Sequence, residues 1–220
     1  PYTTLFRSLH FDYLLFDACF MSSIEALYDL RGCADRIIAS PCEVMAAGFN
    51  YTDILPHLLA DAGTSYDLPG VCSEYHDYYM NRATTKSGCI ALTVTGELEP
   101  LAAIVKEIET KYPGKTYDRA SLQTYEGLDE HVFYDLQGYI EAICDEKDPL
   151  LDKFRAQMGK AFPTESRLHT PSFYSVYGLG DAPNGMHTIE DGKYSGVTTS
   201  APCERFAPEW AQTSWYRATH

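Results

Sequence analysis

The stretch "YLLFDACFMSSIEALYDLR", residues 13–31, joins an apolar run to a pattern with helical spacing. The run over residues 11–17 is short and rich in aliphatic and aromatic side chains, which is typical of a buried strand. Apolar residues then recur at helical intervals, at Ile24, Leu27 and Tyr28. The stretch therefore predicts a strand that leads directly into a helix, with Asp17 and Cys19 at the junction.

The residues after this junction continue the same alternation. Ser22 and Glu25 have the spacing of a capping box, in which each side chain bonds a free amide at the helix start. Gly32 indicates the helix end, and "DRIIAS" at 35–40 predicts a second strand that Pro41 ends. Strand, helix and strand within about 30 residues form a βαβ unit, which implies parallel pairing.

The rest of the chain divides into two parts. Over residues 9–112 we expect an α/β layer sandwich, completed by helices at 51–60 (interrupted at Pro56), 70–83 and 97–112 and by a strand at 89–96. Over residues 113–220 we expect a smaller, mainly helical part. Its predicted elements are helices at 135–145 and 149–161 and short β segments near 165–177 and 194–200.

Composition narrows the class of protein. With 220 residues, 45% hydrophobic and 22% charged, the chain suits one globular domain. The net charge of −14 disfavours nucleic acid and anionic membranes and favours cationic partners. No apolar stretch reaches the roughly 18 residues that a membrane-spanning helix needs. The seven cysteines form no CxxC pair, which argues against zinc and thioredoxin motifs, and their odd number argues against a disulfide framework. We expect most of them to be buried.

The first eight residues, "PYTTLFRS", correspond to the translated end of a widely used sequencing adapter. We therefore predict that residues 1–8 are an artefact and leave them out of the fold. On this interpretation the natural chain begins at Leu9 or shortly before. A signal peptide or an upstream catalytic partner would then be missing from the sequence.

Asp17 and Cys19 are the candidate site residues. Alternate residues of a strand face the same way, so extended geometry would aim both side chains into one space, where α/β proteins place their sites. A helix N-terminus favours a thiolate, but free cysteine has a pKa of about 8.5 and still needs a base. The charge of Asp17 disfavours a thiolate, so this acid suits a cation on a substrate better. A buried structural cysteine and a helix-capping aspartate remain open as alternatives.

Residues 14–58, "LLFDACFMSSIEALYDLRGCADRIIASPCEVMAAGFNYTDILPHL", resemble the catalytic-cysteine block of clostripain-like peptidases. This family belongs to the caspase-like group, with gingipains and legumains. "YSGVTTSAP" (194–202) and "WYRATH" (215–220) are similar to the same family. The resemblance implies a three-layer caspase-like α/β sandwich with a mostly parallel sheet. Residues 9–112 would be the C-terminal part of its core, and 113–220 a subdomain that packs on it.

The resemblance also implies roles. Cys19 would be the nucleophile, its backbone amide would contribute to the oxyanion hole, and Asp17 would line a pocket for lysine or arginine before the scissile bond. The family's base is an upstream histidine followed by glycine, which this sequence lacks. His10 enters the same strand and would lie roughly 30 Å away, and the other six histidines fall in helical or loop contexts. We therefore predict that the 220-residue chain alone is inactive.

One departure from the family concerns the loop after the second strand. Many members have Pro-Gly-Asp-Gly there, whose acid is a second carboxylate in the pocket, but "VMAAGF" (44–49) has Ala47 at that place. A single acid holds a cation less tightly, and Glu43 is the alternative acid in the loop. The resemblance implies no cofactor other than calcium, which some members bind and for which no ligands are evident here.

Two functions follow as hypotheses. The first is a secreted or envelope-anchored bacterial cysteine endopeptidase, expected to be a monomer that acts on proteins or peptides. The second is a non-catalytic surface binding module on the same scaffold, in which the thiol of Cys19 is incidental.

Overall fold

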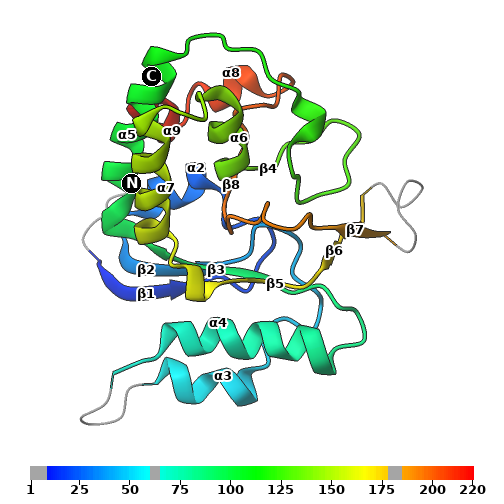
Figure 1. Cartoon of the computed structure of the whole chain (residues 1–220). Helices are drawn as coiled ribbons and strands as arrows, with labels where there is room; N and C mark the ends of the chain where they lie inside the picture. Colours follow the sequence, from blue (N-terminus) through cyan, green and yellow to red (C-terminus); the bar gives the residue numbers. More distant parts are fainter. Residues whose placement is uncertain (1–8, 60–64, 178–184) are drawn as a thin grey trace.

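The computed structural model describes residues 9–59, 65–177 and 185–220. The expected artefact, residues 1–8, lies outside this part. At the centre is a four-stranded sheet (Figure 1). Its strands, in spatial order, are β1 (Phe11–Leu15), β2 (Ala34–Ala39), β3 (Cys89–Val94) and β5 (Arg167–His169).

The sheet is mixed. β1 and β2 pair in parallel through the crossover helix α2 (Ile24–Leu30), as the βαβ pattern predicts. β3 pairs antiparallel with both β2 and β5, so parallel pairing is limited to one pair in the described sheet. The cause is the two-helix connection that follows β2, because its second helix returns the chain to the sheet edge that it left. Ala39, at the end of β2, therefore lies opposite Ala91, near the start of β3.

Helices cover both faces of the sheet, which confirms the three-layer α/β sandwich (Figure 1). On one face lie α3 (Tyr51–Leu58) and α4 (Leu68–Asp77), which ends in a π-helical turn (Tyr78–Arg82). Their buried side chains meet the sheet in a cluster that includes Ile38, Ile54 and Tyr75. On the other face are α2, α5 (Leu98–Lys111), α6 (Leu136–Ile143), α7 (Pro149–Ala161) and α9 (Ser214–Thr219).

The second half of the chain shares this sheet and core. β5 extends the sheet at β3, and α7 packs against α5. Four short strands form two separate ribbons. These are β4 (Tyr134–Asp135) with β8 (Thr198–Thr199), and β6 (Ser172–Tyr174) with β7 (Met186–Thr188). β6 and β8 lie in the regions where β segments were expected, whereas β4 and β7 lie outside them. The helix α8 (Ala207–Trp210) precedes α9. The division at residue 112 stays a prediction.

The start of α2 differs from the predicted capping box. Ser23, not Ser22, is the N-cap, and its Oγ accepts a hydrogen bond from the amide of Ala26 at 3.3 Å. Ser22 Oγ donates instead to the carbonyl of Gly196 at 2.7 Å. Glu25 does not return to the helix start, because its carboxylate serves the C-terminal segment.

Glu25 joins α2 to residues far along the chain. Its Oε1 accepts hydrogen bonds from Thr199 Oγ1 at 2.8 Å, the Ser200 amide at 3.0 Å and Trp210 Nε1 at 2.9 Å. Burial raises the pKa of Glu25, and these donors oppose that shift by stabilising the carboxylate. The C-terminal segment is thereby fixed on the helix that follows the candidate site.

Asp135 is a second buried carboxylate with a structural role. Its Oδ1 accepts from the Gly138 amide at 2.8 Å, which caps α6. Its Oδ2 accepts from Tyr125 Oη at 2.8 Å and from the amide and hydroxyl of Ser195 at 2.8 and 2.7 Å. Burial raises its pKa, and the four donors act in the opposite direction.

We expect Asp135→Asn to lower the free energy of unfolding by about 2–4 kcal/mol, because its amide would place a donor against donors. Urea denaturation measures the change. Asp118→Asn is the matched control, since Asp118 is an exposed cap that bonds Ala120 and asparagine caps as well as aspartate. Equal effects from the two substitutions would contradict the role of Asp135.

Candidate active site

The candidate residues lie in a turn, not in the strand. The Phe16 amide still bonds the carbonyl of Ile38 at 2.9 Å, but β1 has already ended at Leu15. The chain then turns, and Phe20 adopts a left-handed φ of 59°. The expectation that strand alternation extends to residue 19 and aligns Asp17 with Cys19 is therefore wrong. Both side chains nonetheless contact one segment, residues 43–51, which comprises most of the loop after β2 and the first residue of α3.

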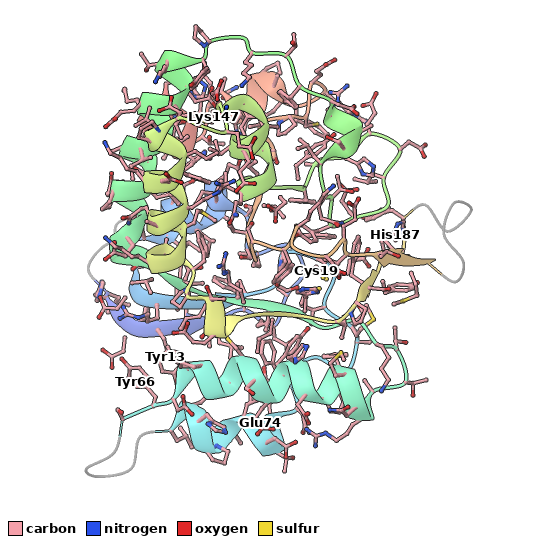
Figure 2. All side chains as sticks on the ribbon, in the orientation of Figure 1. Tyr13, Cys19, Tyr66, Glu74, Lys147 and His187 are labelled. Carbon is pink, nitrogen blue, oxygen red and sulfur yellow. The ribbon has the colours of Figure 1, made fainter. Side chains whose placement is uncertain are left out.

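The thiol of Cys19 is exposed at this turn (Figure 2). Its Sγ accepts a hydrogen bond from the Val44 amide at 3.3 Å and lies 3.7 Å from the Val44 carbonyl oxygen. Five of the other cysteines are buried, as expected, and Cys33 is half-buried. Burial raises the pKa of Cys72, for example, to about 12, which keeps such a thiol protonated and unreactive.

The residue after Cys19 is held in an unfavourable conformation. A non-glycine residue with positive φ costs on the order of 1 kcal/mol and persists only where its surroundings enforce it. Here the Phe20 amide bonds the carbonyl of Cys42 at 3.1 Å. The Phe20 ring stacks on Phe133 with centroids 4.6 Å apart and planes 3° from parallel. These contacts hold the backbone at Cys19 in one conformation.

Asp17 is exposed and lies against the backbone of Gly48. Gly48 has a φ of 59°, and a Cβ there would lie 2.6 Å from Oδ2 and 2.8 Å from Oδ1 of Asp17. Tyr51 donates its hydroxyl to Asp17 Oδ2 at 3.0 Å. None of the ion pairs found among the described side chains includes Asp17. Its charge is therefore available to a cationic ligand.

The structure places both loop residues that bear on a second acid, Ala47 and Glu43. Ala47 is exposed in the turn that precedes Gly48 and offers only a methyl group. Glu43 Oε1 accepts hydrogen bonds from Ser175 Oγ at 2.8 Å and the Val176 amide at 2.9 Å. The carboxylate of Glu43 thus anchors the segment after β6 to the loop beside Cys19.

The histidines are engaged elsewhere. Five bond an acid or a carbonyl, and the other two stack on aromatic rings: His10 with Asp35, His57 with Asp67, His76 with the His169 carbonyl, His131 with Glu126, His169 with the Thr170 carbonyl, His187 on Phe173 and His220 on Tyr216. None of these side chains is hydrogen-bonded to Cys19 in the described part of the chain. The general base is not among the groups that contact the sulfur.

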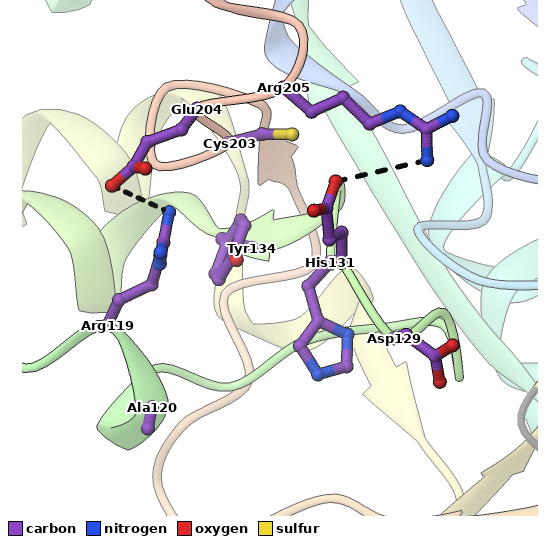
Figure 3. Close-up of a pocket in the computed structure, with 9 residues that line it drawn as sticks. Arg119, Ala120, Asp129, His131, Tyr134, Cys203, Glu204 and Arg205 are labelled. Carbon is purple, nitrogen blue, oxygen red and sulfur yellow. Dashed lines mark ion pairs between the residues drawn. The ribbon is translucent and has the colours of Figure 1, made fainter.

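A polar pocket of about 680 Å³ lies apart from this turn (Figure 3). It is bounded by two ion pairs, Arg119 with Glu204 at 3.2 Å and Arg205 with Glu130 at 3.9 Å. Neither Asp17 nor Cys19 lines it. The exposed thiol and the carboxylate, rather than pocket volume, identify the candidate site.

Within residues 9–59, 65–177 and 185–220, no three histidine, cysteine or acidic side chains gather as a metal site. In the same residues no helix has the length and apolar character required to cross a bilayer.

A three-layer α/β sandwich with an exposed thiol at its rim is the arrangement that the resemblance implies for caspase-like cysteine peptidases. Within that class the chain belongs to the clostripain family, whose model matches residues 3–179. This match confirms the resemblance found in the sequence. No curated protein matches the chain in sequence.

Several solved structures are similar to the chain. A clostripain from Bacteroides thetaiotaomicron is 34% identical with a TM-score of 0.83, over 96% of this chain and 88% of that one. A secreted C11 cysteine protease of the same organism has the same identity and TM-score, and the match spans 56% of its length. A cysteine protease from B. fragilis is 26% identical with a TM-score of 0.84, over 99% of this chain and 90% of that one.

We expect Gly48→Ala to displace the carboxylate of Asp17, because the new methyl group would overlap both oxygens and the backbone disfavours a side chain at positive φ. The free energy of unfolding should fall by about 1–2 kcal/mol. Preferential labelling of Cys19 by cationic thiol reagents should also decline, as measured by mass spectrometry.

Gly32→Ala is the matched control for this experiment. A Cβ at Gly32 meets no atom within 4 Å, so this substitution should change neither stability nor labelling by much. A Gly48→Ala protein that retains the cation preference would show that Asp17 does not depend on the close backbone.

Proposed function

We propose that Cys19 is the nucleophile of a cysteine endopeptidase that cleaves after lysine or arginine. The observation that carries the proposal is that an exposed thiol and a carboxylate with no cationic partner among the described residues both contact segment 43–51. The other described cysteines do not combine these features, since five are buried and Cys33 is half-buried.

The reaction proposed is acyl transfer. The thiolate of Cys19 attacks the substrate carbonyl carbon, the amine of the following residue leaves with a proton, and water hydrolyses the resulting thioester. The hydrogen bond from the Val44 amide supports an anionic sulfur, because donors stabilise the charged form. The backbone amide of Cys19 is the proposed oxyanion donor.

Proton removal requires a base that the described contacts do not supply. Thiol activation ordinarily depends on an adjacent imidazole within about 3 Å. No histidine is hydrogen-bonded to Cys19 in the described part of the molecule. His187, whose buried Nε2 has no hydrogen-bond partner, stacks on Phe173, and His220 stacks on Tyr216. We therefore infer that the 220-residue chain alone turns over no peptide.

Basic specificity rests on Asp17. A carboxylate without a cationic partner near the nucleophile attracts an ammonium or guanidinium group of a substrate. The clostripain from B. thetaiotaomicron was solved in complex with the peptide inhibitor BTN-VLTK-AOMK, whose peptide letters end in lysine. A lysine at the end of that bound peptide supports the proposed role of Asp17.

The second candidate is a binding module without catalysis. The absence of a base among the groups bonded to Cys19 favours it. In that case Asp17 would still bind a basic side chain, but the thiol would contribute nothing. For either function we propose action outside the cell or at its envelope, on peptides or proteins, as a monomer. Two of the similar proteins are described as secreted. A calcium requirement remains a proposal from family resemblance.

Charge-selective labelling tests the site without turnover. Methanethiosulfonates that carry a trimethylammonium, a methyl or a sulfonate group should label Cys19 in that order of rate. One carboxylate near the sulfur should change the ratio of cation to anion rates by roughly tenfold, and Asp17→Asn should remove this difference. Asp35→Asn is the control, because Asp35 pairs with His10 beside the opposite end of β1. An unchanged ratio in Asp17→Asn would argue against the cation site.

Chemical rescue separates the enzyme from the binding module. We expect no hydrolysis of lysine- or arginine-ending fluorogenic peptides by the chain alone, and slow hydrolysis when concentrated imidazole supplies the base. Cys19→Ala should abolish the rescued rate. Rescued rates that are equal in both proteins would favour the binding module. Unassisted turnover that disappears in Cys19→Ala would show that the chain contains its own base.

A further inference from the structure

We propose that Tyr51 determines specificity by occupying one oxygen of Asp17, so that the site prefers the ammonium of lysine to the guanidinium of arginine. The inference rests on the proposed function and extends it. It assigns a role to a residue that neither the strand–helix pattern nor the family resemblance singled out.

The position of Tyr51 is fixed by its helix. Tyr51 is the first residue of α3, directly after the loop that contacts the candidate site. Ile54, one turn later, is fully buried, and Phe49 packs on Tyr75 with centroids 4.5 Å apart. The Tyr51 side chain itself remains 46% exposed. Its hydroxyl thus reaches Asp17 from a rigid base while the ring stays accessible to a ligand.

Asp17 has little freedom between this hydroxyl and the backbone. Tyr51 Oη donates to Oδ2 at 3.0 Å, and Gly48 lies so close to both carboxylate oxygens that a methyl group on it would have no room. Desolvation and the hydrogen bond to Asp17 raise the pKa of Tyr51. The hydroxyl therefore stays protonated and remains a donor over the working pH range.

The number of acceptors then distinguishes the two substrates. A guanidinium is a planar fork of five N–H donors and binds best when both carboxylate oxygens are free. Here Oδ2 is shared with Tyr51, and Ala47 adds no acceptor. An ammonium is compact and has three donors. It can be satisfied by Asp17 Oδ1, a lone pair of Tyr51 Oη and water.

The exposed ring of Tyr51 acts in the opposite direction, because guanidinium groups stack well on aromatic faces. Tyr51→Phe separates the two contributions. It retains the ring for stacking and releases Oδ2 for a bidentate contact. The preference should therefore move toward arginine in this variant.

The experiment uses the full chain and three peptidyl chloromethyl ketones that differ only in a final lysine, arginine or norleucine. At pH 9 an ordinary thiol is largely ionised, so no base is required. The thiolate sulfur attacks the methylene carbon, a C–S bond forms, the C–Cl bond breaks and chloride leaves. Intact mass and peptide mapping give the second-order rate constant at Cys19.

We expect wild-type protein to react faster with the lysine reagent than with the arginine reagent. Tyr51→Phe should lower the lysine-to-arginine ratio by roughly threefold, the effect of one neutral hydrogen bond. The norleucine rate should not change. Tyr66→Phe is the matched control. It removes a hydroxyl from another tyrosine ring on the same side of the sheet, one that packs on Tyr13.

Ala47→Asp provides a second, independent variant. A carboxylate beside Gly48 supplies the missing acceptors, so the ratio should again fall, mainly through a faster arginine reaction. A wild-type preference for arginine, or an unchanged ratio in both variants, overturns the role of Tyr51. If both basic reagents still exceed norleucine, the proposed function survives that result. If neither exceeds norleucine, the basic specificity itself is wrong.

Discussion

The turn that carries Asp17 and Cys19 depends on the backbone of the neighbouring strand. Two main-chain bonds fix it to β2 and the residues that follow, from Phe16 to Ile38 and from Phe20 to Cys42, at 2.9 and 3.1 Å. Because β1 and β2 are parallel, the chain leaves the sheet at the same edge after each of these two strands. The loop after β2 is thereby brought beside the turn, and its amides and its glycine become the surroundings of the two functional groups.

In this arrangement, backbone groups contact the two functional side chains, and other side chains connect the site to the rest of the molecule. The sulfur of Cys19 is met by the Val44 amide, and the carboxylate of Asp17 by the Gly48 backbone. Backbone contacts of this kind need a particular chain path, which is supplied by the left-handed residues Phe20 and Gly48. Glu43 and Glu25 then connect the site to later segments, through the residues after β6 and near β8 respectively. The second half of the chain thus supports a site to which it contributes no proposed reactive group.

Hydrophobic periodicity predicted the local helices and strands well, because the burial of an apolar face determines both the periodicity and the element. The strand at the start, the helix after Cys19 and the strand at 35–40 all form, and most cysteines are buried. The strand end at Leu15 was missed, since apolar residues continue to Phe16, whose amide still bonds the Ile38 carbonyl although the regular strand has ended. The direction of β3 was also unpredictable from local pattern. It depends on α3 and α4 packing as a pair, which is a tertiary contact.

The site was predicted only in part, because some of its contacts are also tertiary. Cys19 and Asp17 stood out by residue type and position, whereas Tyr51 looked like an ordinary helix residue. Its hydroxyl gains meaning only from the partner that folding brings to it across 34 positions of sequence. Glu25 shows the converse, because a perfect local motif was overridden by three donors from the C-terminal segment. Buried or shared carboxylates accept hydrogen bonds from the strongest set of donors within reach, and sequence spacing alone does not reveal that set.

A single acid can attract any cation, so charge alone does not explain how a peptidase distinguishes lysine from arginine. Discrimination between two groups of equal charge must come from the number and geometry of acceptors. At Asp17 these are limited by a hydroxyl from α3 on one side and by a glycine backbone on the other. In the proposed specificity, the same two contacts that hold the carboxylate in place also restrict which cation it can bind fully. Rigidity and selectivity at this site would then have one structural cause.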